Sequence, residues 1–120
     1  MDLNEIVKIQ KAFDSKHGWT PNEDIKTIIS FINKDIIGII GELGEFSNEV
    51  KKINLIGDSI NKDNLVNEYL SRKDNLAEEL VDTFIYLIRI SSHMNLDLEY
   101  QYLKKLEKNK NRFKDFQIND

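Results

Sequence analysis

The chain contains no cysteine, one proline and five glycines in 120 residues. The absence of cysteine excludes disulfide bridges, thiolate zinc sites and cysteine nucleophiles, and it fits a reducing compartment. The apolar runs are too short to cross a bilayer, and the first residues, "MDLNEIVKIQ", lack the apolar stretch of a signal peptide. We therefore predict a cytoplasmic protein with no membrane partner.

Positive charge is in the minority, because 17 Lys and Arg residues face 21 Asp and Glu residues, a net charge of −4. Long nucleic acids bind to basic surfaces, so this balance argues against them as partners. A small anionic ligand that arrives with cations remains possible. The 40% hydrophobic and 32% charged composition is typical of a globular helical protein. The length predicts one domain, residues 1–120, whose small core can depend on partner chains.

Apolar residues recur at three- and four-residue steps along most of the chain, which predicts helices. The first helix is expected to begin after Asp2, with Glu5 completing a capping box. It is expected to end near His17 and Gly18, since glycine fits the left-handed conformation that follows many helices.

A second helix start is predicted at "TPNE", with Thr20 as N-cap, Pro21 at the first helical position and Glu23 closing the box. A long apolar stripe follows. Because one straight helix of that length would overrun a small domain, we expect a break near Asn33–Asp35. The stripe consists of Ile25, Ile29, Ile32, Ile36, Ile39, Leu43, Phe46, Val50 and Ile53.

Turn-forming residues at 57–71 predict a connecting loop, with a short helical turn at Leu65–Leu70. The next helix is expected to start after Ser71, where Asp74 completes the N-terminal motif, and to stop at Asn95.

A last helix is predicted from Leu98 to about Phe113, with Asp97 as its cap. Short connections and amphipathic faces then predict an all-α fold, an antiparallel four-helix bundle. No strand pattern competes with it.

Two pairs of acids lie beside the predicted core. In "IIGELGEFSNEV", Glu42 and Glu45 share one face of the helix, because each residue turns by about 100°. Glu79 and Asp82 form a second pair on the next helix, on the same face as Tyr86, Arg89 and His93. If the helices face each other, four carboxylates converge and repel. A divalent cation removes that conflict, and oxygen ligands suit Mg²⁺ or Mn²⁺.

One other interpretation of these acids is open and a second is excluded. They could form ordinary surface ion pairs, such as Glu45 or Glu49 with Lys52. A di-iron carboxylate bundle is set aside, because it requires Glu-x-x-His motifs that the chain lacks. Gly38, Gly41 and Gly44 favour a site, since each costs roughly 1 kcal/mol relative to alanine inside a helix. Such glycines indicate a close approach of a neighbouring helix or ligand.

Three segments, "GELGE", "EELVDTFIYL" and "DLEYQYLKKLEKNKNRF", resemble the MazG-like, all-α nucleoside triphosphate pyrophosphohydrolases. "AFDSKHGW" is similar to the N-terminal pattern of that family. The resemblance implies Mg²⁺-dependent hydrolysis of (deoxy)nucleoside triphosphates to the monophosphate and pyrophosphate, in nucleotide-pool sanitation, by a homodimer or homotetramer. It implies four Mg²⁺ ligands, which are Glu42, Glu45, Glu79 and Asp82. It places Trp19 and Tyr86 near the nucleotide. It gives the task of holding the phosphates or the protomer interface to Lys105, Asn109 and Arg112.

The chemistry of such a site assigns further roles. We expect Glu45 to act as general base, with cationic help from Lys52 as a second catalytic residue and from Arg89 as a substrate-binding residue. Trp19, Tyr86 and Phe13 are candidates for stacking on a base, although simple core packing is the preferred explanation for Phe13. His93 is expected to be a histidine with its hydrogen bonds satisfied rather than a ligand.

Two alternatives to this function stay open. The same carboxylates could serve a special nucleotide, such as dUTP or phosphoribosyl-ATP. The chain could instead be a non-catalytic helical interaction protein whose acids are only surface charges.

Overall fold

The computed structural model describes residues 1–58 and 62–118, without the side chains of residues 62 and 63. The regular structure in these ranges is entirely helical, so the predicted all-α class is confirmed for the described part of the chain. The elements are α1 (Leu3–Lys16), α2 (Ile25–Gly57), α3 (Lys62–His93), α4 (Leu98–Arg112) and the 3₁₀ helix η1 (Lys114–Phe116).

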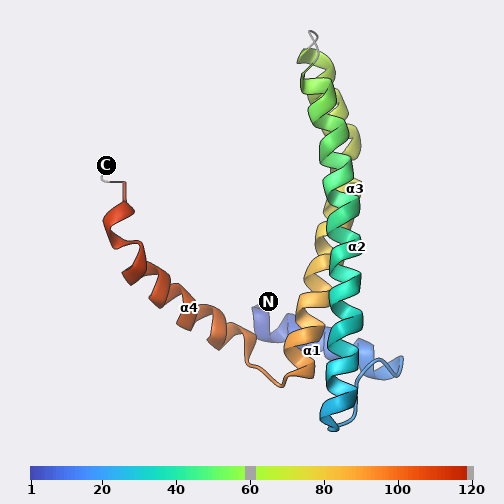
Figure 1. Ribbon diagram of the computed structural model, residues 1–120, viewed down its shortest axis with the longest axis vertical. Coiled ribbons are helices and arrows are strands. Elements are labelled where there is room, and N and C mark those ends of the chain that lie inside the picture. The colour runs from blue at the N-terminus through green and yellow to red at the C-terminus, as the bar shows by residue number, and fades with distance from the viewer. Residues whose placement is uncertain (59–61, 119–120) are drawn as a thin grey trace.

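The dominant feature is a hairpin in which α2 and α3 run antiparallel over their whole length (Figure 1). Helix α1 crosses the base of this hairpin against α3, and α4 leads away from it. The radius of gyration is 18.8 Å, whereas a compact domain of this length has about 14 Å. One copy of the chain is therefore elongated.

The start of α1 follows the prediction, whereas the start of α2 does not. Asp2 accepts a hydrogen bond from the backbone N–H of Glu5 at 2.9 Å, and Gly18 has a φ of 72° just beyond the helix. Helix α2 begins only after Asp24, whose carboxylate accepts from the backbone N–H of Thr27 at 3.3 Å. Asp24 is a better N-cap, because it directly precedes the first residue of the apolar stripe. The predicted start at Thr20, Pro21 and Glu23 is wrong, and these residues form the connection from α1.

Both long helices extend further than predicted. Helix α2 has no break at Asn33–Asp35, and α3 begins at Lys62, so the predicted loop is wrong over residues 62–71. The short helical turn expected within it at Leu65–Leu70 is helical, as part of α3. Residues 59–61 of that loop lie outside the described residues. The expected break assumed a compact domain. In the structure the two helices instead pack along each other. One part of the predicted stripe is half-buried, and another part stays exposed: Ile32, Ile39, Phe46, Val50 and Ile53 are half-buried, whereas Ile25, Ile29, Ile36 and Leu43 are exposed. Ser71 lies inside α3, where its hydroxyl donates to the carbonyl of Glu68.

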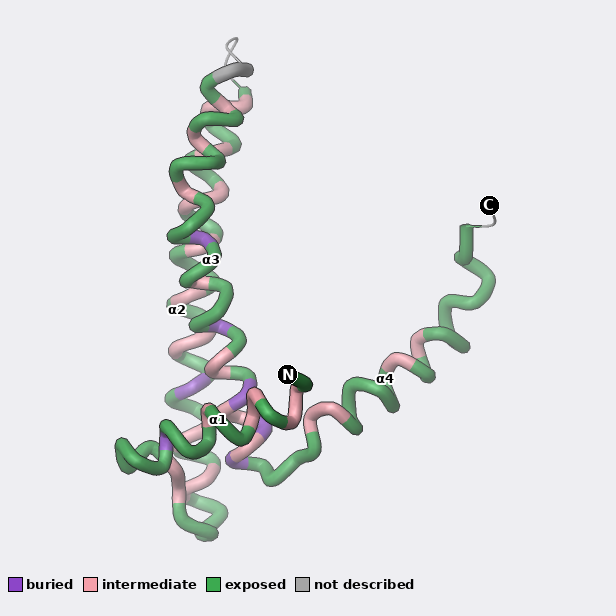
Figure 2. Tube along the Cα trace, turned by 180° about the vertical axis from the view of Figure 1, so that it is seen from behind, coloured by how far each residue is buried: buried purple, intermediate pink, exposed green. Residues whose placement is uncertain are grey.

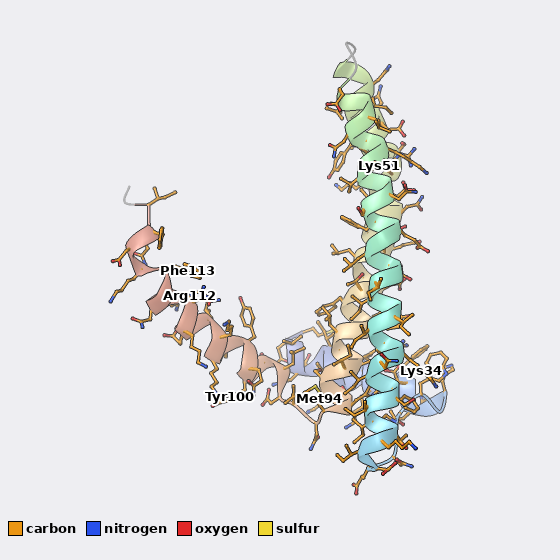
Figure 3. All side chains as sticks on the ribbon, viewed as in Figure 1. Lys34, Lys51, Met94, Tyr100, Arg112 and Phe113 are labelled. Atoms are coloured by element: carbon orange, nitrogen blue, oxygen red, sulfur yellow. The ribbon has the colours of Figure 1, made fainter. Side chains whose placement is uncertain are left out.

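The last connection agrees with the prediction. Asn95 adopts a left-handed φ of 56° after α3, and Asp97 caps α4 by accepting from the backbone N–H of Tyr100 at 3.1 Å. The Asn4 side chain donates to Glu99 at 2.7 Å, which holds the first turn of α4 against α1. Beyond that turn α4 projects outward, with Tyr100, Arg112 and Phe113 along it (Figure 3).

The core of a single copy is small. Among the described apolar side chains only Leu76 and Ile88 are buried, and Ile88 is 1% exposed. The buried positions lie in the lower and middle parts of the hairpin and on α1, while α4 contains none (Figure 2). Large apolar side chains on α2, α3 and α4 stay exposed.

Candidate functional site

The acidic pairs lie at the middle of the hairpin, Glu42 and Glu45 on α2 and Glu79 and Asp82 on α3. Burial raises the pKa of Glu42, and the nearby charges of Glu45, Asp82 and Glu79 raise it further. Burial also raises the pKa of Glu79, with help from the charges of Glu45 and Glu49. The four carboxylates are therefore electrostatic neighbours, as the helical spacing predicts.

One oxygen of this cluster has no partner. Oε2 of Glu79 is buried and accepts no hydrogen bond within the described ranges. A buried carboxylate oxygen without a partner is costly, and hard cations satisfy such oxygens. Across the described residues, no three acidic or histidine side chains are already arranged to ligate one ion. The carboxylates border one another without meeting at a single point.

The contact between Gly38 and Tyr86 brings the helices together beside the acids. A Cβ atom on Gly38 would lie 2.6 Å from Cε1 and 2.8 Å from Cε2 of the Tyr86 ring. The prediction of a close approach is thus confirmed at Gly38. No described helix approaches Gly41 or Gly44, where a Cβ atom would meet no described atom within 4 Å. A close approach of a ligand at these two glycines stays a prediction.

An arginine surrounded by aromatic rings lies next along α3. The guanidinium of Arg89 is 5.2 Å from the ring centre of Trp19 and 5.4 Å from that of Tyr86. It also donates to the buried carboxylate of Asp14 at 3.1 Å, and Gln10 donates to the same oxygen at 2.9 Å. Arg89 is therefore fixed in position by a charge and two rings.

Phe13 belongs to the same aromatic group and not to the core. It is 49% exposed and lies near the rings of His17 and Trp19. Core packing is therefore the wrong explanation for Phe13. Trp19, 45% exposed, stacks on His17 with ring centres 4.8 Å apart.

His93 is satisfied by a partner that the sequence reasoning missed. Its Nε2 lies 2.8 Å from Oδ2 of Asp35, and both residues are buried. Burial raises the pKa of Asp35, and His93 opposes that effect. The expectation of a satisfied histidine is confirmed. The sequence contained one sign that Asp35 is buried. This acid lies within the apolar stripe, three residues after Ile32 and four before Ile39.

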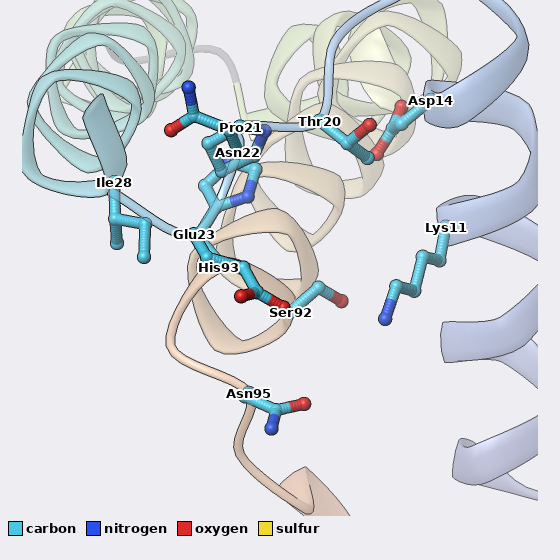
Figure 4. A pocket seen from close by; sticks show the side chains of 10 residues that line it. All are labelled: Lys11, Asp14, Thr20, Pro21, Asn22, Glu23, Ile28, Ser92, His93 and Asn95. Carbon is cyan, nitrogen blue, oxygen red and sulfur yellow. The ribbon is translucent and has the colours of Figure 1, made fainter. Parts of the chain in front are cut away.

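A hollow of about 370 Å³ opens at the base of the hairpin, between α1, the connection to α2 and the end of α3 (Figure 4). The distance along α3 from Asp82 to His93 is about 16 Å at 1.5 Å per residue, so this hollow is separate from the carboxylates. Its lining consists of Lys11, Asp14, Thr20, Pro21, Asn22, Glu23, Ile28, Ser92, His93 and Asn95.

Several predicted site residues lie apart from the acids in one copy. Lys52 is exposed, two helical turns beyond Glu45. Glu49 forms its described ion pair with Arg72, at 2.6 Å. The alternative interpretation of the acids had paired Glu49 with Lys52 on the surface. Lys105, Asn109 and Arg112 are on α4, which packs against α1 and η1 at some distance from the middle of the hairpin (Figure 1).

No protein-family model, curated protein or solved structure matches this chain. Within the part of the chain that the structure describes, no helix is both long enough and apolar enough to cross a membrane.

Proposed function

We propose that the protein is a Mg²⁺-dependent nucleotide pyrophosphohydrolase, which converts (deoxy)nucleoside triphosphates to the monophosphate and pyrophosphate in the cytoplasm. The observation that carries this proposal is the partnerless buried oxygen of Glu79 within a group of neighbouring carboxylates, of which Glu42 and Glu79 have a raised pKa. A divalent cation stabilises such a group, because it neutralises the repulsion and ligates the partnerless oxygen. The sequence resemblance to MazG-like enzymes supports the same chemistry.

The donor set fits Mg²⁺ or Mn²⁺. The described candidates are carboxylates from facing helices, and hard oxygen ligands are those that these ions prefer. Glu42, Glu45, Glu79 and Asp82 would hold the ion. When bound, the ion would supply charge neutralisation at the phosphates and a water of lowered pKa.

Side chains of the protein itself would supply the general base, the attraction for the phosphates and the surface on which the base stacks. Glu45 is exposed, and we assign it as the base that takes a proton from the attacking water. Arg89 lies on the same face of α3, held by Asp14 and the two rings, and would attract the phosphates. Trp19 is half exposed beside Arg89 and would stack on the base, which an aromatic face does without selecting among bases.

Three further residues do not reach this site in a single copy. Lys105, Asn109 and Arg112 are carried on α4, away from the carboxylates. Their implied role at the phosphates or at a protomer interface therefore requires assembly of two or four copies, which is part of the proposal.

The test is pyrophosphate release from a panel of canonical nucleotides, dUTP and phosphoribosyl-ATP, with Mg²⁺ and with EDTA. We expect metal-dependent release by the wild type and its loss in Glu79→Gln. Glu78→Gln is the matched control, because Glu78 is its exposed neighbour and should keep full activity. Release from dUTP or phosphoribosyl-ATP alone would name the special-nucleotide alternative. No release from any nucleotide would favour a non-catalytic interaction protein.

A further inference from the structure

The hollow at the base of the hairpin contains a buried acid with an unused oxygen. The side chain of Asp14 is 4% exposed, and both Arg89 and Gln10 donate to its Oδ1. Oδ2 of Asp14 accepts no hydrogen bond from the residues that the structure describes, and Asp14 lines the hollow beside Thr20 (Figure 4). A buried carboxylate oxygen requires a donor, and a positively charged donor forms the strongest bond with it. The hollow therefore suits a ligand that carries an ammonium group.

A cation lines the same hollow. Lys11 precedes Asp14 by three residues on α1 and is exposed. Its side chain extends toward Ser92 and Asn95 rather than toward Asp14 (Figure 4). Among the described residues, Lys11 forms no ion pair. The hollow therefore presents an acid and a separate cation, each able to bind a ligand group of opposite charge.

A hydroxyl beside the hollow also lacks a partner. Oγ of Ser92 is buried and forms no hydrogen bond within the described ranges. The neighbouring Ser91, by contrast, donates to the carbonyl of Ile88 at 2.7 Å, as serines inside helices commonly do. A buried hydroxyl without a partner is costly. Because Ser92 lines the hollow, rotation about its Cα–Cβ bond would let the hydroxyl bond to a polar ligand there.

The size and the lining of the hollow restrict the ligand further. Its volume of about 370 Å³ is at the lower end of small-molecule sites, which span about 300–1,000 Å³. Among the described lining residues only Pro21 and Ile28 are apolar, so the ligand should be small and polar. One wall is fixed, because the buried ring of His93 lies 2.8 Å from Oδ2 of Asp35. A fixed wall lowers the entropy cost of binding.

We propose that this hollow binds a small zwitterion, a free amino acid, with its ammonium group at Asp14 and its carboxylate at Lys11. Residues three apart on a helix have Cβ atoms about 5–6 Å from each other, so a compact ligand can reach both. A simple amine would leave Lys11 without a partner, and a simple acid would bring negative charge beside Asp14. A nucleoside triphosphate has no ammonium group, so the proposal is independent of the proposed hydrolysis.

The test is isothermal titration calorimetry of the full-length chain with each of the common amino acids, in the absence of nucleotide. We expect at least one of them to bind with a dissociation constant below about 1 mM. The matched probes for the best ligand are its decarboxylated amine and its deaminated acid, each of which keeps one of the two charges. Both should bind at least about tenfold more weakly. Binding of no amino acid, or equal affinity of either probe, would overturn the proposal.

Replacement of the cation tests the carboxylate end of the ligand. Lys11→Met should weaken binding about tenfold to a hundredfold, the loss expected for a hydrogen bond between charged groups. The matched control is Lys16→Met, because Lys16 is also exposed on α1 but lies about 140° around the helix from Lys11. Lys16 is not among the described lining residues, so its replacement should keep the wild-type affinity. Equal affinities of the two variants would overturn the role of Lys11.

Two further variants test the other ligand contacts. Asp14→Asn keeps the shape of the side chain and removes its charge, so the amino acid should bind at least about tenfold more weakly. The deaminated acid should bind this variant as well as or better than the wild type, because no carboxylate repels it. Ser92→Ala should leave the melting temperature without ligand unchanged or higher and weaken binding several-fold. Wild-type affinity of Asp14→Asn or Ser92→Ala for the amino acid would refute the contact that each removes.

Discussion

The contact between Gly38 and Tyr86 gives the sharpest test of the packing. Three glycines recur within seven residues of α2, yet only Gly38 has a neighbour in the space of its missing Cβ atom. The ring atoms of Tyr86 occupy that space, including Cε1 at 2.6 Å. The same substitution, glycine to alanine, should therefore have opposite effects at positions on one helix.

The magnitude follows from two opposing contributions. Alanine in a helix interior gains about 1 kcal/mol over glycine, so Gly41→Ala and Gly44→Ala should each stabilise the fold by that amount. Gly38→Ala receives the same gain but forces the Tyr86 ring to move, and overpacking costs about 1–3 kcal/mol. We expect Gly38→Ala to be roughly neutral to 2 kcal/mol destabilising. The difference between Gly38→Ala and Gly41→Ala isolates the packing contribution, about 1–3 kcal/mol.

Urea unfolding followed by circular dichroism measures these differences, with all variants at one protein concentration because assembly shifts stability. The double variant Gly38→Ala with Tyr86→Leu provides a further control. Removing the ring should restore the gain from alanine, so the two changes should be non-additive. Equal stabilisation by Gly38→Ala and Gly41→Ala would show that Tyr86 does not set the spacing of the helices.

Three further predictions concern charge. The raised pKa values of Glu42 and Glu79 mean that the folded chain binds more protons than the unfolded chain, so in EDTA the stability should rise as the pH falls from neutral toward the ordinary value of 4.5. Mg²⁺ should flatten this profile in thermal scans, and the opposite slope in EDTA would contradict crowded carboxylates. Arg72→Met should lower the urea midpoint, since Arg72 bridges Glu49 and Glu68, whereas Lys73→Met should leave it unchanged. His93→Ala should cost about 3 kcal/mol in thermal unfolding, because it leaves buried Asp35 without its partner; an effect no larger than that of exposed Met94→Ala would refute this.

Local features were predictable from the sequence. The caps of α1 and α4 depend on hydrogen bonds between residues three apart, so Asp2 and Asp97 could be identified directly. The facing carboxylates followed from the turn per residue, because Glu42, Glu45, Glu79 and Asp82 keep their spacing on any regular helix.

Features that depend on the shape of the whole chain were not predictable. The break expected in α2 assumed a compact domain, and nothing local indicates that α3 accompanies α2 over its full length. The partners of Asp14 and Asp35 are far away in sequence, at Arg89 and His93, so their burial could not be derived from spacing. The predicted roles of Lys105, Asn109 and Arg112 stay predictions.

The side-chain contacts between α2 and α3 have a consequence for the motions of the hairpin. Side-chain contacts join α2 and α3 on either side of the four carboxylates, an ion pair of Glu49 with Arg72 toward the tip and a hydrogen bond between Asp35 and His93 toward the base. Between these two contacts the neighbouring charges are all negative, those of Glu42, Glu45, Glu79 and Asp82. The middle of the described hairpin thus has like charges facing each other, and the proposed cation would turn this repulsion into an attraction. Amide hydrogens in the central turns should exchange faster than those beside either of these two contacts, and a bound cation would slow the exchange of the central turns first.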